Sequence, residues 1–506
     1  MRRRQFFSGL LAGFSLMRSS SLVADSPSFS GDPFSLGIAS GDATSSSVVL
    51  WTRVAPEPLQ PDGGVGPYAV PVRWEVASDP AMRRLIRGGE LLATPELAHS
   101  VHVDLQGLEA GRDYWYRFQL GRHRTEIGHT KTLPDGLNSS VRFVTASCQN
   151  YTHGYFLAYE HMVTDRPDFV IHLGDYIYDT SYGETFRRHD SERPPRTLSD
   201  YRVRHALYKT DLHLQKAHSA LPFYCVIDNH DAIEDDNPSK YEQRAAAYRA
   251  WYEHMPVRGF TTKRSNSFEM KRLLRIGDLL QISLLDTRQF RDTRDLCVEN
   301  LDQAVGFGNY RERCEGLFAV DRSLLGEEQE DWLYRSLKNN TSAWNVIASS
   351  GPVMPFRLDM EKEEFGYIGA WDAYPENRQR LASELAGALT GQPIILSGDV
   401  HSFWAMDGSL ISNTADRVPG IEFVCSSISA NWPSPLADPI KDNLAYNPHV
   451  AYYNGDERGY LLHEVNAREW LTCLRAIGDA KTKSAEVRNL RRFRVARDNP
   501  ILQEVS

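Results

Sequence analysis

The chain has 506 residues, of which 57 are Lys or Arg and 66 are Asp or Glu, so its formal net charge is −9. This balance provides no overall positive field to gather nucleic acid or an anionic membrane, and we expect no stable nucleic-acid partner. The length allows two domains, each with its own hydrophobic core.

The N-terminus is predicted to be a targeting segment. Arg2, Arg3 and Arg4 precede two phenylalanines and a mildly apolar stretch at residues 9–16, which is too short to span a membrane. The pair Arg3-Arg4 with Gln-Phe-Phe after it resembles the twin-arginine export signal. We expect residues 1–29 to engage the twin-arginine export machinery, and the mature chain, with no transmembrane span, to be periplasmic or secreted. A disordered basic tail is the alternative.

Residues 30–135 are predicted to form a β-sandwich. Short alternating strands, such as SVVLWTRV, PVRWEVAS, SVHVDL and DYWYRFQLG, are separated by turn residues. Leu108, Gly111 and Tyr114 have the spacing of a tyrosine corner, in which the tyrosine hydroxyl bonds back to the preceding turn. This favours an immunoglobulin or fibronectin type III topology, and a Pro-Asp-Gly linker at 134–136 follows it.

Residues 140–506 are predicted to form an α/β domain. Buried-looking strands alternate there with helical stretches such as 198–218 and 239–254. The strands read VRFVTAS, DFVIHLG, FYCVIDN, LLQISLLDT, AWNVIASS and PIILSGD.

The six cysteines include no CxxC pair, which argues against a zinc knuckle or a thioredoxin motif. Cys297 and Cys314 flank a loop-like stretch, and in an exported protein we expect them to form a disulfide. Cys225 and Cys425 lie in apolar, strand-like runs and are expected to be buried hydrophobic residues.

Four of the predicted strands of the α/β domain end in similar polar residues. In open α/β sheets, ligands bind beyond the carboxyl ends of the strands, so these ends should converge. Taken alone, Asp175 would be interpreted as a turn residue, but four such ends are hard to explain as loops. The four ends are Ser147-Cys148-Gln149-Asn150, Gly174-Asp175-Tyr176-Ile177-Tyr178, Asp228-Asn229-His230-Asp231 and Gly398-Asp399-Val400-His401.

The donor types at these ends indicate a metal centre. Asp175 can bridge two ions, and Tyr178 ligates well only where a strongly acidic metal removes its proton, which points to ferric iron. Cys148 as a thiolate and the imidazole of His401 suit the same ion. Asp399 and Asn229 offer hard oxygens that suit calcium, manganese or magnesium.

The motifs SCQNY, HLGDYIYD, DNHD, LLDTRQFRD and SGDVHSFW, preceded by FSLGIASGDATSSSVVLWTRV, occur in this order along almost the whole mature chain. This set resembles the PhoD-like alkaline phosphatases of the metallophosphoesterase superfamily. The resemblance implies a four-layer αββα catalytic domain behind a small β-sandwich, a centre with Fe³⁺ and Ca²⁺, and hydrolysis of phosphate esters.

The resemblance also assigns ligands. Cys148, Asp175, Tyr178 and His401 would hold iron. Asp175, Asn229 and Asp399 would hold the harder divalent ion or ions, with Asp228 as a further candidate. Where the family usually has Asp-Asp-His-Glu, this chain has Asp-Asn-His-Asp at 228–231. The asparagine removes one negative charge, so we expect weaker calcium binding, and Mn²⁺ or Zn²⁺ are alternatives at the second site.

The expected reaction is attack of a metal-bound hydroxide on phosphorus. His230 is the candidate acid for the leaving group, with a core histidine bonded to a backbone carbonyl as the alternative. Arg288 is expected to grip the phosphate, or else to pair with Asp286 or Asp292. His172 is expected to be structural or to support a ligand.

Two other functions fit the same sequence. One is a phospholipase D-like phosphodiesterase on the same scaffold, because both reactions use the same attack and the lining of the cleft decides the substrate. The other is a non-catalytic protein that binds a surface polymer, which predicts that ligand residues are missing from the motifs.

Overall fold

A computed structural model describes residue 29 and residues 31–136, 140–232, 240–259, 268–293, 296, 306–307, 309–360, 363–388, 391–432 and 437–505. The predicted export signal therefore lies outside the described residues, apart from its last position. No helix within the described ranges combines the length and apolar character needed to cross a bilayer.

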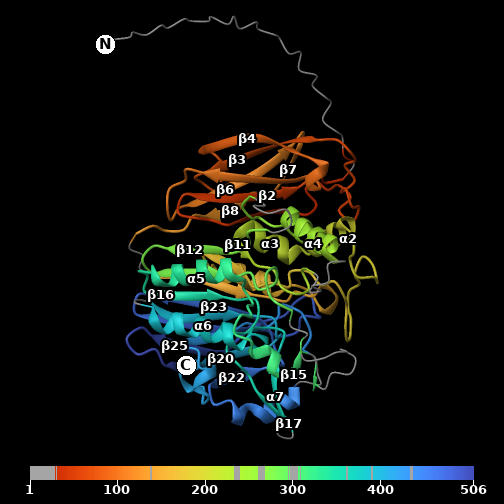
Figure 1. The fold of residues 1–506 in the computed structure, drawn as a ribbon. Helices are drawn as coiled ribbons and strands as arrows, with labels where there is room; N and C mark the ends of the chain where they lie inside the picture. The colour runs from red at the N-terminus through yellow and green to blue at the C-terminus, as the bar shows by residue number, and fades with distance from the viewer. Residues whose placement is uncertain are drawn as a thin grey trace, which may run out of the picture.

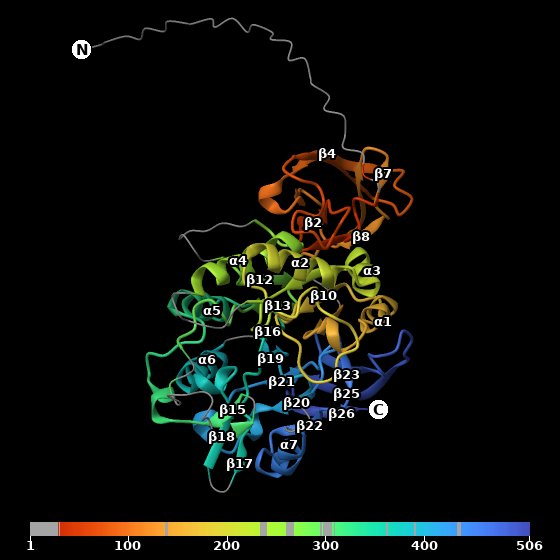
Figure 2. The ribbon, with the colours of Figure 1, turned by 90° about the vertical axis from the view of Figure 1, so that its right-hand side faces the viewer.

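Two large sheets build the α/β part of the molecule (Figures 1 and 2). The ten-stranded sheet runs in the order β26 (Leu502–Val505), β25 (Val487–Ala496), β24 (Glu469–Ile477), β23 (Arg458–Asn466), β9 (Ser140–Ala146), β10 (Phe169–His172), β11 (Pro222–Cys225), β1 (Ile38–Gly41), β2 (Ser47–Arg53) and β5 (Ser100–Gln106). The seven-stranded sheet runs in the order β12 (Arg272–Ile276), β13 (Leu280–Leu284), β16 (Trp344–Ala348), β19 (Gln392–Ser397), β21 (Ile421–Val424), β20 (Phe403–Asp407) and β22 (Val450–Asn454).

Helices cover the outer face of each sheet, and apolar residues fill all three interfaces. Phe143 and Ile171 of one sheet share a core with Ile282 and Val346 of the other. The outer face of the first sheet packs on four helices, and the outer face of the second packs on two. The helices are α1 (Ala158–Asp165), α2 (Leu198–Lys209), α3 (Leu212–Ala220) and α4 (Tyr241–His254) for the first sheet, and α5 (Glu327–Lys338) and α6 (Pro375–Gly387) for the second. The layer order is therefore helix, sheet, sheet, helix, as predicted.

The helical stretch predicted at 198–218 is two helices. Thr197 and Asp200 form a capping box that begins α2. The carboxylate of Asp211 accepts the backbone N–H groups of His213 and Leu214 and begins α3. The chain turns between the two helices because Asp211 satisfies the first N–H groups of a new helix instead of continuing the old one.

The N-terminal sandwich shares one of its sheets with the α/β part. β1 pairs in parallel with β11, and β2 and β5 follow it, so these three strands extend the ten-stranded sheet. The second sheet contains β4 (Leu85–Ala93), β3 (Val70–Ala77), β6 (Asp113–Leu120) and β7 (His123–Arg124), with β8 (Gly128–Lys131) paired to β6. The division into domains at residues 135–140 stays a prediction, because one sheet runs across it.

Two local predictions are confirmed. The hydroxyl of Tyr114 accepts the backbone N–H of Glu109 at 2.9 Å, which is the tyrosine corner. Cys225 and Cys425 are buried and free, and so is Cys148. Cys473 is free and partly exposed. Cys314 is disulfide-bonded, while its predicted partner, Cys297, lies outside the described residues.

A separate four-stranded sheet lies near the strand ends described below. It contains β14 (Gly306–Phe307), β15 (Tyr310–Glu312), β18 (Glu363–Tyr367) and β17 (Leu358–Met360). Helix α7 (Ala437–Asn443) lies next to β17 (Figure 1).

Candidate metal centre

The four predicted strand ends meet in space. Three of them follow β9, β10 and β11, which are parallel neighbours in the ten-stranded sheet, and the fourth follows β19 in the middle of the seven-stranded sheet. A single bridge between Ser147 and Ser427 joins the two sheets at this point. The donors therefore collect where the carboxyl ends of both sheets face one cavity of about 260 Å³.

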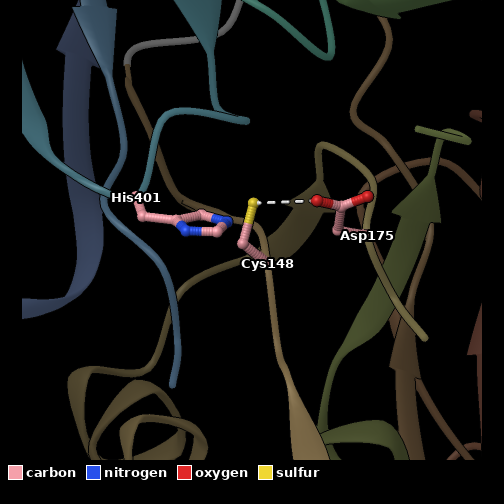
Figure 3. A group of neighbouring side chains, drawn as sticks. All are labelled: Cys148, Asp175 and His401. Carbon is pink, nitrogen blue, oxygen red and sulfur yellow. Dashed lines mark hydrogen bonds between the residues drawn. The ribbon is translucent and has the colours of Figure 1, made fainter. Parts of the chain in front are cut away.

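Cys148, Asp175 and His401 form the first donor group, which we call the thiol side together with Tyr178. One ligand atom from each of the three lies within 4.8 Å of the others, and Figure 3 shows the sulfur of Cys148 between the carboxylate and the imidazole. Sγ of Cys148 lies 3.5 Å from Oδ2 of Asp175, and Oη of Tyr178 lies 3.1 Å from the same oxygen. Sulfur, phenol and carboxylate thus converge on one point.

His401 is oriented to present one nitrogen to this point. Its Nδ1 lies 2.9 Å from the carbonyl oxygen of Asn431, which can only accept, so Nδ1 carries the proton. Its Nε2, with a lone pair, then lies 2.9 Å from Oη of Tyr178. A backbone carbonyl that fixes the far nitrogen is the usual arrangement of a histidine that ligates a metal.

Asp175, Asp228 and Asp399 form the second donor group, which we call the carboxylate side together with Asn229. One oxygen from each carboxylate lies within 4.8 Å of the others. Within the described chain, Oδ2 of Asp228 and Oδ1 of Asn229 are buried without a hydrogen-bond partner. Buried oxygens without a hydrogen-bond donor are rare in proteins. Two of them beside two further carboxylates are expected where a hard cation would bind to these oxygens.

The backbone is strained at these donors. Of the nine non-glycine residues with positive φ in the described chain, four are Cys148 (φ 59°), Asp175 (54°), Asp399 (71°) and His401 (47°). Such conformations cost free energy and persist where the surrounding structure enforces them, often at functional sites. Gly174 is required as well, since a Cβ there would lie 2.4 Å from the Cβ of Asp228.

Burial and mutual repulsion disfavour the negatively charged forms of these donors. Burial raises the pKa of Cys148 and of Tyr178 well above their usual values, and the charge of Asp175 adds to both shifts. Burial also raises the pKa of Asp175 to about 7 and that of Asp399 well above its usual range, with Asp228 contributing to both. A multivalent cation would reverse these penalties, because it favours every anionic form at once.

The donors present therefore fit a metal centre in three respects. They converge, two of their oxygens lack a hydrogen-bond partner in the described chain, and their negative charges are buried close together. The sulfur and phenol donors suit iron, whereas the carboxylate side suits a hard divalent ion.

His230 lies beside the donors and lines the same cavity. Its ring stacks on Tyr178 with centroids 4.2 Å apart, and its Nδ1 lies 2.7 Å from Oδ1 of Asp179. Its backbone N–H donates to Asp175 at 3.0 Å. The ring bonds to a carboxylate at the cavity, which differs from the core histidine considered as the alternative.

Arg288 pairs with Asp228, and not with Asp286 or Asp292 as its predicted alternative. Its Nε donates to Oδ1 of Asp228 at 2.6 Å, and the guanidinium also reaches the carbonyl oxygen of Gly369 at 3.3 Å. It is buried and is not among the residues that line the 260 Å³ cavity. His172 is fully buried in the core below, with both ring nitrogens lacking a partner in the described chain.

Tyr367 and Tyr182 support the donors and were missed in the sequence. Oη of Tyr367, at the end of β18, donates to Oδ2 of Asp399 at 2.7 Å, and Oη of Tyr182 lies 3.2 Å from Nδ1 of His401. Neither tyrosine stands in a strand-end motif. Asp179, in contrast, ends the motif HLGDYIYD. Because it directly follows Tyr178, its position in the sequence could have identified it as a residue of the site.

Comparisons with known proteins give matches along most of the chain. A family model described as "PhoD-like phosphatase" matches residues 143–474, and "PhoD-like phosphatase, N-terminal domain" matches residues 19–134. A protein of Bacillus subtilis (strain 168) named alkaline phosphatase D is 38% identical, with 96% of this chain and 84% of that protein covered.

Solved structures give the same result. A structure titled "Structure of PhoD" has a TM-score of 0.85 at 36% identity and covers 95% of this chain and 93% of its own. A purple acid phosphatase from yellow lupin has a TM-score of 0.56 at 11% identity and covers 91% of this chain and 74% of its own, a likeness of fold alone. Together with the layer order, these matches confirm the αββα metallophosphoesterase fold with an N-terminal β-sandwich region.

Proposed function

Because the chain belongs to the PhoD-like phosphatase family and is thereby a hydrolase of phosphoric ester bonds, we propose that it is an exported alkaline phosphatase with an iron-containing multinuclear centre. We further propose that it hydrolyses phosphate monoesters, diesters or both. The observation that carries the proposal is the convergence of Cys148, Tyr178 and His401 on Asp175.

In this proposal each side of the site takes its own cation. Cys148, Asp175, Tyr178 and His401 would hold Fe³⁺. Asp175, Asn229 and Asp399, with Asp228 beside them, would hold Ca²⁺, with Mn²⁺ or Zn²⁺ as alternatives. Bound cations would supply Lewis-acid chemistry, neutralising the phosphate oxygens and acidifying a water molecule.

The protein's own residues complete the hydrolysis. A water oxygen bonds to phosphorus and the water loses a proton to the solvent. The bond between phosphorus and the ester oxygen breaks, and the leaving alkoxide takes a proton, which the solvent then restores to the acid. His230 is the proposed acid. Because its Nδ1 is bonded to Asp179, the transferred proton would come from Nε2, and the Asp179 carboxylate would stabilise the charged ring.

For Arg288 the geometry supports a different role from the one expected. Its guanidinium holds Asp228 and does not line the metal-site cavity, so it would orient a carboxylate of the centre, and a grip on phosphate would require the side chain to move toward the cavity. An Arg288→Gln variant separates these roles. Lost phosphate contact mainly raises KM, whereas a displaced Asp228 lowers the content of the second metal.

The site supports monoester and diester hydrolysis alike, because both need the same cations and the same acid. The phospholipase D-like alternative therefore depends on substrate shape. The non-catalytic alternative predicts missing donors, and none of the predicted donor residues is missing from the motifs.

The test is direct. Metal-loaded protein would be assayed with nitrophenyl phosphate, its bis-ester and phosphatidylcholine, beside a Cys148→Ala variant. We expect hydrolysis of the first or second substrate and a large loss in the variant. Absence of hydrolysis of all three by the metal-loaded protein would refute the proposed function.

The export proposal rests on Arg3 and Arg4, which lie outside the described residues, and implies a periplasmic or secreted enzyme. Replacing both with lysine should keep the protein in the cytoplasm of a host with twin-arginine export. Equal export of the two forms would contradict a twin-arginine route.

A further inference from the structure

A second cavity meets the metal-site cavity at His230. It has a volume of about 200 Å³, and among the described residues His230 alone lines both. Asp179, the partner of His230, also lines the second cavity. The proposed acid therefore stands at the boundary between the metal donors and this second space.

Two cationic side chains line the second cavity. Arg196 and Lys240 both line it. Within the described part of the chain, neither side chain forms an ion pair or a hydrogen bond. Asp179 is the one carboxylate among the described lining residues, and it is engaged with Nδ1 of His230 at 2.7 Å.

The rest of the described lining is neutral and consists of two helix residues, Tyr201 and Gln243, and two loop residues, Pro194 and Ala232. Tyr201 of α2 is buried, and Gln243 of α4 donates to the carbonyl oxygen of Pro195 at 2.8 Å. Arg196 directly precedes Thr197, the N-cap of α2, and Lys240 is the N-cap of α4, so both cations stand at the starts of helices.

We propose that this cavity is the leaving-group subsite and that it takes a second phosphate carried by the leaving alcohol. The inference rests on the proposed function, in which His230 protonates the leaving oxygen. A group that gives its proton to that oxygen must lie next to it, so the rest of the alcohol extends past His230. The space at that point is the 200 Å³ cavity, and its two unpaired cations are complementary to an anion there.

The experiment uses metal-loaded, full-length protein and two substrate series. The first consists of α,ω-alkanediol bisphosphates with two to five carbons, and the second of alkyl phosphates of equal length. The measured quantity is the ratio of kcat/KM between the two series, per phosphate, from release of inorganic phosphate.

The wild-type ratio should exceed about ten for at least one chain length, because each of the two solvent-accessible cations should raise this ratio by about three- to fivefold. Arg196→Gln and Lys240→Gln should each lower the ratio by about that factor, and the double variant should bring it near one. The ratio should also fall with added salt. Arg193→Gln removes the same charge from an exposed residue outside the lining and should leave the ratio unchanged.

If phosphate is still released from the alkyl phosphates, two results would overturn the subsite. One is a wild-type ratio near one, and the other is a high ratio that persists in the double variant. A failure of the proposed function has a different signature, because neither series would then release phosphate and the bis-ester of nitrophenyl phosphate would stay intact as well. Cleavage of that bis-ester without phosphate release from either series would count against the subsite alone. Charge reversal by Arg196→Glu gives a second readout: it should push the ratio below that of Arg196→Gln, and an equal or higher ratio would count against the subsite.

Discussion

The two sides of the centre differ in chemistry although they share Asp175. On the thiol side, Cys148 and Tyr178 are fully buried, and the second nitrogen of His401 is fixed by a backbone carbonyl. On the carboxylate side, Asn229 and Asp399 line the open cavity, and two oxygens lack partners. One cation would therefore be enclosed by sulfur and phenol donors, while the other would be held by residues that border the cavity.

Asp175→Asn should have the largest effect, because this carboxylate belongs to both sides. Loss of the shared ligand removes several kcal/mol of transition-state stabilisation, so kcat/KM should fall by about 10³-fold or more. Elemental analysis should show that both metals are depleted. Glu192→Gln, which changes the same charge at an exposed residue, is the matched control, and retention of either metal at the wild-type level would argue against a bridging role.

Cys148→Ala and Tyr178→Phe should affect the thiol side alone. We expect Cys148→Ala to weaken iron retention and Tyr178→Phe to abolish the visible charge-transfer band of an iron-bound phenolate, with activity lowered by about 10²-fold. Calcium content should change little. Cys225→Ala removes another buried, free sulfur and should leave the spectrum intact. Unchanged iron content and spectrum in both site variants would reject the thiol side as an iron site.

Tyr367→Phe should affect the carboxylate side with a smaller loss. The hydroxyl holds Oδ2 of Asp399 at 2.7 Å, and removing such a supporting bond costs about tenfold in metal affinity. Calcium titration of the iron-loaded protein would measure this change. Tyr310→Phe is the control, since Tyr310 lines the same cavity without a bond to Asp399 in the described chain. Equal calcium affinities in the two variants would show that Tyr367 does not support calcium binding through Asp399.

Asn229→Asp should give the smallest change, and in the opposite direction. The added negative charge should tighten binding of the hard divalent ion by a few-fold, since ligand charge helps to set calcium affinity. Iron content should not change, because Asn229 lies on the carboxylate side. Weaker calcium binding in this variant would mean that the amide oxygen holds the ion better than a carboxylate does.

Much of this site could be predicted from the sequence because its donors directly follow buried strands. The apolar runs before Cys148, Asp175, Asp228 and Asp399 identify the strands, and the carboxyl ends of parallel strands converge. The donor types then indicate which cations suit each group. Local pattern and side-chain chemistry therefore suffice for the four loops.

The rest depends on tertiary arrangement that a local pattern does not encode. The partner of Arg288 is Asp228, 60 residues away, and no spacing along the chain distinguishes it from Asp286 or Asp292. Tyr367 reaches Asp399 from a separate small sheet. The pairing of β1 with β11 likewise joins strands far apart in the sequence, and alternation of residues predicts a strand without naming its neighbour.

Elemental analysis of the purified wild-type protein, together with its visible spectrum, would show whether the centre holds two kinds of metal. We expect about one iron per chain, at least one hard divalent ion, and a visible band from the phenolate of Tyr178. A colourless protein that contains only zinc or manganese would contradict this expectation, because the sulfur and phenol donors would then have no ferric ion to bind.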